Sequence, residues 1–264
     1  MNLKDFIPQI ITAVLEASAA IMKIYTSDFE VEFKKDDSPV TIADKTSNEI
    51  LYKVLQSSGI QVISEEENKP SFESRKDEMV WLLDPLDGTK EFINKSNEFC
   101  ICIALIKNNK SIFGLIANPI EQEIIFGGEE IPAAKIKFDN TKIFSKKYQL
   151  PQLSKTQIDT IIYSRTHHTP RIDYFIKNQE QVHGTIERTL KGSALKFFDL
   201  VEEKAQVYIR LWPTMEWDIA AGQAIYESIG GEVLELTNFE PLVYNKKDLQ
   251  NPQFLAKPKN LKLV

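Results

Sequence analysis

The chain has 264 residues, of which 42% are hydrophobic and 27% are charged. Its length is enough for one large domain or two packed halves, and its composition argues against a disordered or fibrous protein. The formal net charge of −6 argues against a nucleic-acid partner, because proteins that coat nucleic acid need an excess of lysine and arginine. The expected partner is therefore a small molecule, and a small anion would have to be bound by local features of the chain.

The start of the chain shows no sign of export or membrane insertion. Met1 to Phe6 lacks a basic region followed by an apolar signal core, and no apolar run approaches the ~20 residues that span a bilayer. We therefore expect a cytoplasmic protein with no transmembrane segment. Peripheral association with the inner membrane and the oligomeric state stay open.

The two cysteines of the chain, Cys100 and Cys102, lie two positions apart in an apolar run that predicts a strand. Their side chains then share one face of the strand, where a disulfide between them would be strained. Two thiolates without a nearby third ligand also make an incomplete metal site. We expect two buried, reduced thiols, which suits a reducing compartment.

The first predicted elements are two amphipathic helices. Apolar residues recur at helical spacing over residues 4–26 and again over 44–56, where Thr41 or Asp44 is the expected N-cap. Short apolar runs then predict an antiparallel sheet behind these helices, with strands at 62–63, 80–83, 99–106, 112–118 and 123–126.

After Pro132 the pattern becomes mixed. Strands are predicted at 160–163, 205–210 and 232–236, and helices at 194–203 and 218–228. Prolines and a lysine-rich stretch interrupt the periodicity between residues 130 and 155. The predicted fold class is therefore α+β, with an N-terminal half at 1–140 and a C-terminal half at 141–264.

The most informative segment joins a predicted strand to a tight turn with two carboxylates. It reads WLLDPLDGT over residues 81–89. Pro85 and Gly88 fix a loop that points Asp84 and Asp87 into one pocket, where their repulsion is costly unless cations lie between them. Carboxylate oxygens suit Mg²⁺ or Mn²⁺. Taken alone, the segment could also be an ordinary polar turn.

Three further segments place an acidic residue at the end of a predicted element. They are SEEE at 64–67, PVTIAD at 39–44 and WDIAAG at 217–222. Taken singly, Glu65 belongs to a solvated charge run, and Asp44 and Asp218 are helix N-caps. Their occurrence together with Asp84 and Asp87 favours one shared acidic pocket.

In this order, the four segments resemble the inositol monophosphatase superfamily of metal-dependent, lithium-sensitive phosphatases. The resemblance runs from about residue 34 to residue 231 and implies a layered αβαβα sandwich of the inositol monophosphatase and sugar phosphatase type. Within that superfamily, the chain resembles the CysQ-type 3′(2′),5′-bisphosphate nucleotidase branch. Five segments carry this resemblance: DPLDGTKEFI at 84–93, SEE at 64–66, SRTH at 164–167, GSALKF at 192–197 and YIR at 208–210.

The resemblance implies two magnesium sites, with manganese as a possible substitute. Glu65, Asp84 and the carbonyl of Leu86 would hold the first ion. Asp84, Asp87 and Asp218 would hold the second, so that Asp84 bridges the two. A third, weaker ion near Glu65 is often part of the family pattern.

The resemblance also implies roles around the reacting phosphate. Asp44 and Thr89 would act together on the attacking water, and the backbone N–H groups of Gly88 and Thr89 would hold the phosphate. Without its acidic neighbours, Thr89 would be interpreted as a turn residue.

Substrate selection is expected from the second half. The resemblance implies contacts from five residues, Ser164, His167, Ser193, Lys196 and Arg210. His167 could instead be an exposed residue at a helix start. Ala194 departs from the branch pattern, where a second small hydroxyl residue is common.

The leading functional hypothesis is hydrolysis of adenosine 3′,5′-bisphosphate to AMP and phosphate, a disposal step of sulfate assimilation. Metal-activated water would attack without a covalent phosphoenzyme. Hydrolysis of inositol phosphate or sugar phosphate would use the same metals. A catalytically silent regulator that binds metal and phosphate is the alternative from another class, although it has no need for both Asp44 and Thr89.

Overall fold

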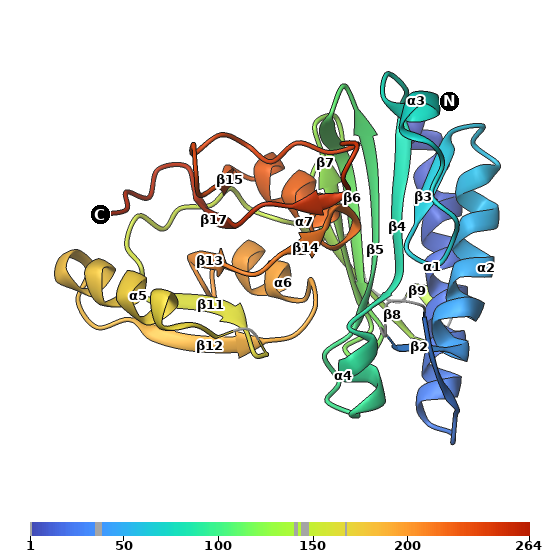
Figure 1. The fold of residues 1–264 in the computed structure, drawn as a ribbon, viewed down its shortest axis with the longest axis horizontal. Coiled ribbons are helices and arrows are strands. Elements are labelled where there is room, and N and C mark those ends of the chain that lie inside the picture. Colours follow the sequence, from blue (N-terminus) through green and yellow to red (C-terminus); the bar gives the residue numbers. More distant parts are fainter. Residues whose placement is uncertain (1, 35–38, 140–141, 144–147, 167) are drawn as a thin grey trace.

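The computed structural model describes residues 2–34, 39–139, 142–143, 148–166 and 168–264. These residues form successive layers: a helix pair, a large sheet, a second helix pair, a smaller sheet and an outer helix (Figure 1). The predicted αβαβα sandwich is confirmed.

The large sheet has eight strands within the described residues, in the order β10-β8-β7-β6-β5-β4-β3, with β9 paired to β8. Their bounds are β3 (Gln61–Ser64), β4 (Val80–Asp87), β5 (Cys100–Lys107), β6 (Lys110–Asn118), β7 (Glu123–Gly128), β8 (Ala134–Asp139), β9 (Lys142–Ile143) and β10 (Tyr148–Gln149). The expectation of a wholly antiparallel sheet is wrong at one edge, because β3 lies parallel to β4. The connection over residues 65–79, which includes α3 (Phe72–Arg75), is long enough to return the chain to the starting end of the sheet.

Helices α1 (Leu3–Tyr25) and α2 (Ile42–Gln56) cover one face of this sheet (Figure 1). They are separated by a small hairpin of β1 (Val31–Phe33) and β2 (Pro39–Thr41). Helix α2 begins at Ile42 because Thr41 is its N-cap, with Thr41 Oγ1 accepting from the N–H of Ala43 at 3.1 Å. Asp44 is therefore the third helical residue and not the cap.

Helix α1 meets the length and composition of a membrane-spanning helix, although the sequence patterns indicated no such segment. In this fold its apolar face packs into the core: Ile10 and Val14 are buried, and the ring of Phe6 lies 6.2 Å from that of Trp81 on β4. A core helix passes the same test of length and composition, so the test by itself does not indicate a membrane span.

The other face of the large sheet is covered by α7 (Glu216–Ser228), with α6 (Lys196–Val201) beside it (Figure 1). The backbones of β6 and α7 approach so closely that a Cβ added at Gly114 would lie 2.0 Å from the carbonyl oxygen of Ala221. This close approach holds α7 against the sheet, and Asp218 in the first turn of α7 lies close to Asp84 on β4.

The smaller sheet has the strand order β12-β11-β13-β17-β15. Its strands are β11 (Thr160–Ser164), β12 (Glu187–Lys191), β13 (Val207–Arg210), β15 (Gly231–Glu235) and β17 (Phe254–Pro258). Helix α5 (Pro170–His183) covers its outer face, and β14 (Thr214–Met215) pairs with β16 (Gln250–Asn251) beside it. Sequence patterns missed β12 because this edge strand is largely exposed and lacks an apolar run.

The proposed division of the chain at residues 140/141 stays a prediction. Strand β10 still pairs with β8 of the large sheet, and the smaller sheet starts at β11.

Candidate active site

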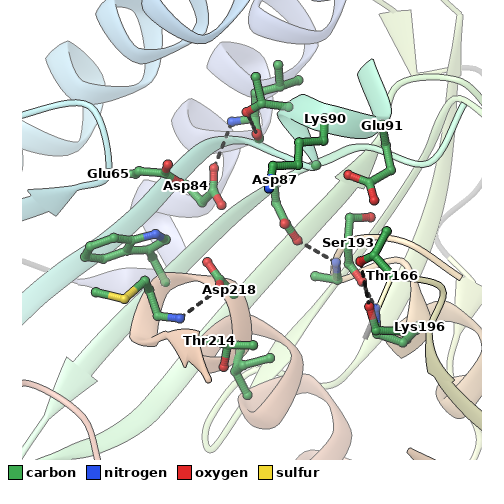
Figure 2. A pocket seen from close by; sticks show the side chains of 18 of the residues that line it. Glu65, Asp84, Asp87, Lys90, Glu91, Thr166, Ser193, Lys196, Thr214 and Asp218 are labelled. Carbon is green, nitrogen blue, oxygen red and sulfur yellow. Dashed lines mark hydrogen bonds between the residues drawn. The ribbon is translucent and has the colours of Figure 1, made fainter. Parts of the chain in front are cut away.

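A cavity of about 540 Å³ lies where the end of β4, the start of α7 and the ends of β11 and β13 meet. Of the residues predicted for the site, it is lined by Glu65, Asp84, Leu86, Asp87, Gly88, Thr89, Ser164, Ser193, Lys196, Arg210 and Asp218. Asp44 lies behind Thr89, to which it is hydrogen-bonded, and His167 lies outside the described residues. Figure 2 shows Glu65, Asp84 and Asp218 on one side of the cavity, Ser193 and Lys196 on the other, and Asp87 between them.

Strand β4 delivers Asp84 and Asp87 to the same cavity because it is irregular at its end. Side chains three positions apart on a regular strand point to opposite faces. Here the pairing of β4 with β5 shifts register between Asp84 and Asp87, and both residues line the cavity. The N–H of Leu86 donates to Asp84 Oδ1 at 3.0 Å, which fixes that carboxylate.

Three carboxylates form a compact group. Glu65 follows β3, Asp84 lies on β4 and Asp218 lies in the first turn of α7, yet one oxygen of each lies within 4.8 Å of the others. The N–H of Met215 donates to Asp218 Oδ2 at 2.8 Å. Burial raises the pKa of Asp84 well above its usual range, and repulsion by Glu65 and Asp87 raises it further. The pKa of Asp218 is raised by burial and then by Asp87 and Glu65.

This group has the chemistry of a divalent-cation site. All its donors are carboxylate oxygens, the ligands that Mg²⁺ and Mn²⁺ prefer. The raised pKa values show that the negative charges of Asp84 and Asp218 are costly in this place unless a positive charge offsets them. Protons can supply that charge, and so can a bound cation. The residues therefore fit a divalent cation.

Sequence reasoning missed a lysine at the edge of this group. Lys34 Nζ lies 2.8 Å from Glu65 Oε1 and 2.6 Å from Glu66 Oε1. Glu65 and Glu66 thus both form ion pairs with the Lys34 ammonium group, although Lys34 is 31 positions from Glu65 in the chain. No local sequence signal connects these residues.

Asp87 is oriented differently from the compact group. Its Oδ2 accepts from the N–H of Ala194 at 2.5 Å and lies 3.8 Å from Cys100 Sγ. Burial raises the pKa of Asp87 to about 6, although the charge of Lys196 and the bond from Ala194 oppose this rise. Asp87 therefore connects the acidic group to the second half of the molecule.

The prediction of two buried, free cysteines is confirmed, but the expectation that no third ligand is nearby is wrong, because one carboxylate oxygen of Asp87 and the two sulfur atoms lie within 4.8 Å of one another. Cys100 and Cys102 are free and buried on β5, and their sulfur atoms are 3.8 Å apart on the same face of the strand.

Thr89 and Asp44 form a short hydrogen-bonded chain behind the cavity. Thr89 Oγ1 donates to Asp44 Oδ1 at 2.8 Å, while Asp44 Oδ2 accepts from the backbone N–H and the hydroxyl of Thr41, both at 2.7 Å. Burial raises the pKa of Asp44, and the three hydrogen bonds oppose that rise. The Leu86 carbonyl, 3.3 Å from Thr89 Oγ1, is a second and more distant acceptor. With the hydroxyl hydrogen directed to the nearer Asp44, the lone pairs of the oxygen are available on the cavity side.

Gly88 has a conformation that explains its residue type. Its φ is +97°, and an added Cβ would lie 2.7 Å from the carbonyl oxygen of Glu98. Only glycine fits this left-handed, crowded position. Gly88 is the N-cap of helix α4 (Thr89–Ile93), and both Gly88 and Thr89 line the cavity.

Lys196 lines the cavity but is only 3% exposed, so it is not a solvated residue on a helix surface. Its Nζ donates to the carbonyls of Ser193 at 2.5 Å and Lys191 at 3.2 Å, and it lies 5.1 Å from the centre of the Tyr208 ring. Burial lowers the pKa of Lys196 to about 8, while the charge of Asp87 opposes this shift.

The remaining wall is polar and comes from the smaller sheet. Arg210 Nε donates to the carbonyl of Trp212 at 2.9 Å, and Ser164 Oγ lies 3.4 Å from Thr166 Oγ1. Thr166 and Tyr208 line the cavity but were not predicted. Alternation along β13 could have identified Tyr208, because it shares a strand face with Arg210.

Comparison with known proteins agrees with this geometry. The sequence pattern of the inositol monophosphatase family matches residues 2–263. The 3′(2′),5′-bisphosphate nucleotidase CysQ of Escherichia coli strain K12 is 34% identical over 252 residues, which are 93% of this chain and 97% of that protein. The crystal structure of CysQ from Bacteroides thetaiotaomicron matches with a TM-score of 0.83 and 36% identity, over 94% of this chain and 95% of that chain.

A more distant structure shares the fold. The inositol monophosphatase from Anabaena sp. PCC 7120 matches with a TM-score of 0.73 and 22% identity, over 99% of this chain and 92% of that chain. The layered fold, the acidic cavity and the match over nearly the whole sequence lead to one conclusion: the chain belongs to the inositol monophosphatase family.

Proposed function

We propose that the chain is a magnesium-dependent phosphomonoesterase that hydrolyses adenosine 3′,5′-bisphosphate to AMP and phosphate. The observation that carries this proposal is the pairing, in one cavity, of a buried carboxylate group with a separate cationic wall of Lys196 and Arg210. A substrate with two phosphates needs both features, one at the scissile phosphate and one at the other. The similarity to proteins named 3′(2′),5′-bisphosphate nucleotidase supports the same substrate class.

The acidic group is proposed to hold the metal. Glu65, Asp84 and Asp218 would provide most of the oxygen ligands, joined by Asp87 and the Leu86 carbonyl. Divalent cations bound there supply Lewis-acid activation of water and neutralise charge on the phosphate oxygens. Two or three ions are expected, with Mn²⁺ as a possible substitute for Mg²⁺.

Thr89 and Asp44 are proposed to orient the attacking water. The Thr89 hydroxyl donates a hydrogen bond to Asp44, so toward the water its oxygen acts as an acceptor. Asp44 is held by Thr41 and keeps this polarity fixed. The Gly88 and Thr89 backbone would hold the phosphate, because the missing Cβ of Gly88 permits close approach.

The rest of the substrate is proposed to lie against the second half. Ser164, Ser193, Lys196 and Arg210 offer hydroxyl and cationic groups for the nucleoside monophosphate portion. His167 stays a prediction for this role. A phosphorylated small molecule is thus the expected partner, and a cytoplasmic location suits the two free, buried thiols.

A panel of substrates tests the proposal directly. Phosphate release is measured from adenosine 3′,5′-bisphosphate, inositol 1-phosphate and a sugar phosphate, each with magnesium and with a chelator. We expect magnesium-dependent release and a kcat/KM for the bisphosphate at least ~100-fold above the values for inositol 1-phosphate and the sugar phosphate. A substrate without the second phosphate leaves the polar groups of the site that would bind it without a partner, which is costly. Preference for inositol 1-phosphate would assign the alternative activity, and no release from any substrate would favour a silent binding protein.

Lithium is expected to inhibit this activity far more strongly than sodium. Lithium is a small, hard cation and would occupy one of the carboxylate-lined magnesium positions, whereas sodium is larger and holds oxygen ligands less tightly. The measurement compares initial rates in lithium and sodium chloride at equal ionic strength. Equal rates in the two salts would contradict a magnesium position that lithium can occupy.

A further inference from the structure

The segment of residues 192–196 carries Ser193 and Lys196 to the cavity and is anchored on the other half of the molecule. The N–H of Gly192 donates to Glu98 Oε2 at 2.8 Å, and the N–H of Ala194 donates to Asp87 Oδ2 at 2.5 Å. Glu98 lies two residues before the start of β5, and Asp87 ends β4. Two nearby amides of this segment are thus bonded to two carboxylates of the large-sheet half.

Glu98 is itself held by an arginine of the second half. Arg165, which follows β11, donates from Nε to Glu98 Oε2 at 3.2 Å and from its NH2 group to Glu98 Oε1 at 2.5 Å. The same NH2 group donates to the carbonyl of Leu190 on β12 at 3.1 Å. A guanidinium that engages both carboxylate oxygens fixes the carboxylate plane, so Glu98 presents a rigid, charged acceptor to Gly192.

The backbone between the two anchors is tight and strained. A Cβ added at Gly192 would lie 2.9 Å from Glu91 Cγ and 3.1 Å from Glu98 Cβ. Ser193 has a φ of +48°, a left-handed conformation that costs free energy for a residue with a side chain. Such a residue persists where its surroundings determine it, and here the bonds to Glu98 and Asp87 lie on either side of it.

The position of Lys196 depends on this strained backbone. Lys196 Nζ donates to the carbonyl of Ser193 at 2.5 Å, so the ammonium follows the segment when the segment moves. Asp87 is linked to the same segment through Ala194. Glu98 is absent from the described residues that line the cavity, so any influence on substrate must pass through these neighbours.

We propose that Glu98, clamped by Arg165, is a positioning residue that holds segment 192–196 in its substrate-binding conformation. It sets the location of Ser193 and Lys196 without touching the substrate. This inference rests on the proposed function and deepens it, because it names the hydrogen-bond acceptor that Glu98 offers to Gly192 of the other half as a determinant of substrate affinity.

Five variants of the full chain test the proposal: Glu98→Ala, Glu98→Gln, Arg165→Ala, the double variant Glu98→Ala/Arg165→Ala and, as control, Arg188→Ala. Arg188 is matched to Arg165, since it is similarly exposed and forms an ion pair with Asp173 away from the cavity. Glutamine at position 98 keeps a carbonyl acceptor for Gly192 but loses the ion pair with Arg165.

The first readout needs no substrate. Amide hydrogen exchange at Gly192 and Ala194, followed by NMR, is expected to accelerate about tenfold or more in Glu98→Ala, because the acceptor of Gly192 is lost. Helix α1 is expected to exchange as in the unaltered protein, and Arg188→Ala to leave segment 192–196 unchanged. Glu98→Gln is expected to restore most of the protection.

The second readout is kinetic. Glu98→Ala is expected to raise KM for adenosine 3′,5′-bisphosphate about tenfold while kcat falls by less than about threefold, with Glu98→Gln recovering most of the loss. The double variant Glu98→Ala/Arg165→Ala should be no worse than Glu98→Ala, because Arg165 acts through Glu98.

The outcomes separate this inference from the proposed function. Unchanged exchange at Gly192 and Ala194 in Glu98→Ala, equal acceleration throughout the protein, or an unchanged KM overturns the positioning role. If the unaltered enzyme releases no phosphate from any substrate, the proposed function fails, and the exchange data still decide whether Glu98 holds the segment.

Discussion

Replacing Asp84 by asparagine is expected to abolish turnover and, at the same time, to stabilise the metal-free protein. Asp84 is buried within the group that includes Glu65 and Asp218 and is proposed to bridge two cations. Loss of several kcal/mol of charge stabilisation in the transition state would lower kcat by ~1000-fold or more. Asparagine keeps an oxygen that can accept from the N–H of Leu86, so the fold should survive.

The stability change follows from the direction of the pKa shift. The folded protein raises the pKa of Asp84 above the usual 3.8, so the folded state binds this proton more tightly than the unfolded state. The stability of the metal-free protein therefore falls as pH rises above the usual value and through the raised pKa. The gain from Asp84→Asn should be absent below the usual pKa, partly present at about pH 5 and larger at about pH 7.5, because stability lost by the unaltered protein accumulates over this range.

The measurements are kcat at saturating magnesium and melting temperatures with and without magnesium, at about pH 5 and about pH 7.5. Magnesium should raise the melting temperature of the unaltered protein and have a smaller effect on the variant. Asp173→Asn is the matched control, because Asp173 pairs with Arg188 outside the cavity. Near-normal turnover in Asp84→Asn, or lower stability than the unaltered protein without metal at neutral pH, would be incompatible with the proposed metal group.

Replacing Lys196 by methionine is expected to weaken binding of the bisphosphate selectively. Methionine retains much of the buried stem and removes the charge. A charged hydrogen bond contributes ~1.5–3 kcal/mol, so KM for adenosine 3′,5′-bisphosphate should rise about tenfold or more. Inositol 1-phosphate has no second phosphate and should be much less affected.

The pH dependence gives a second test of Lys196. With a pKa of about 8, the Lys196 side chain carries a positive charge at neutral pH and loses this charge as the pH rises above the pKa. The kcat/KM of the unaltered enzyme for the bisphosphate should therefore fall as pH rises through about 8, and Lys196→Met should lack this decline. Lys257→Met is a suitable control, since Lys257 is 12% exposed, lies in the same half and pairs with Glu232 outside the cavity. Equal losses for both substrates would instead indicate a structural role for Lys196.

The elements that carry the acids were predictable because their signals are local. The apolar run that ends at Asp84 has the composition of a buried strand, and the turn after it contains Pro85 and Gly88. Thr41 and Asp44 are spaced as a capping box, the first as the N-cap and the second as the third residue of α2. Alternation also predicted that Cys100 and Cys102 share one buried face. In each case, neighbouring residues contain the physical information.

The sequence by itself therefore determined the α+β class and, through the family resemblance, most of the site residues that line the cavity, but not Thr166 or Tyr208. Only the tertiary structure decided how those residues are oriented and charged. Lys196 is buried because the smaller sheet covers it, and Asp87 turns to Ala194, which is 107 positions away. Glu98 meets Arg165 across 67 positions. Burial, pKa shifts and hydrogen bonds between the halves depend on what packs around a group, and chain segments this far apart leave no periodic or spacing signal in the sequence.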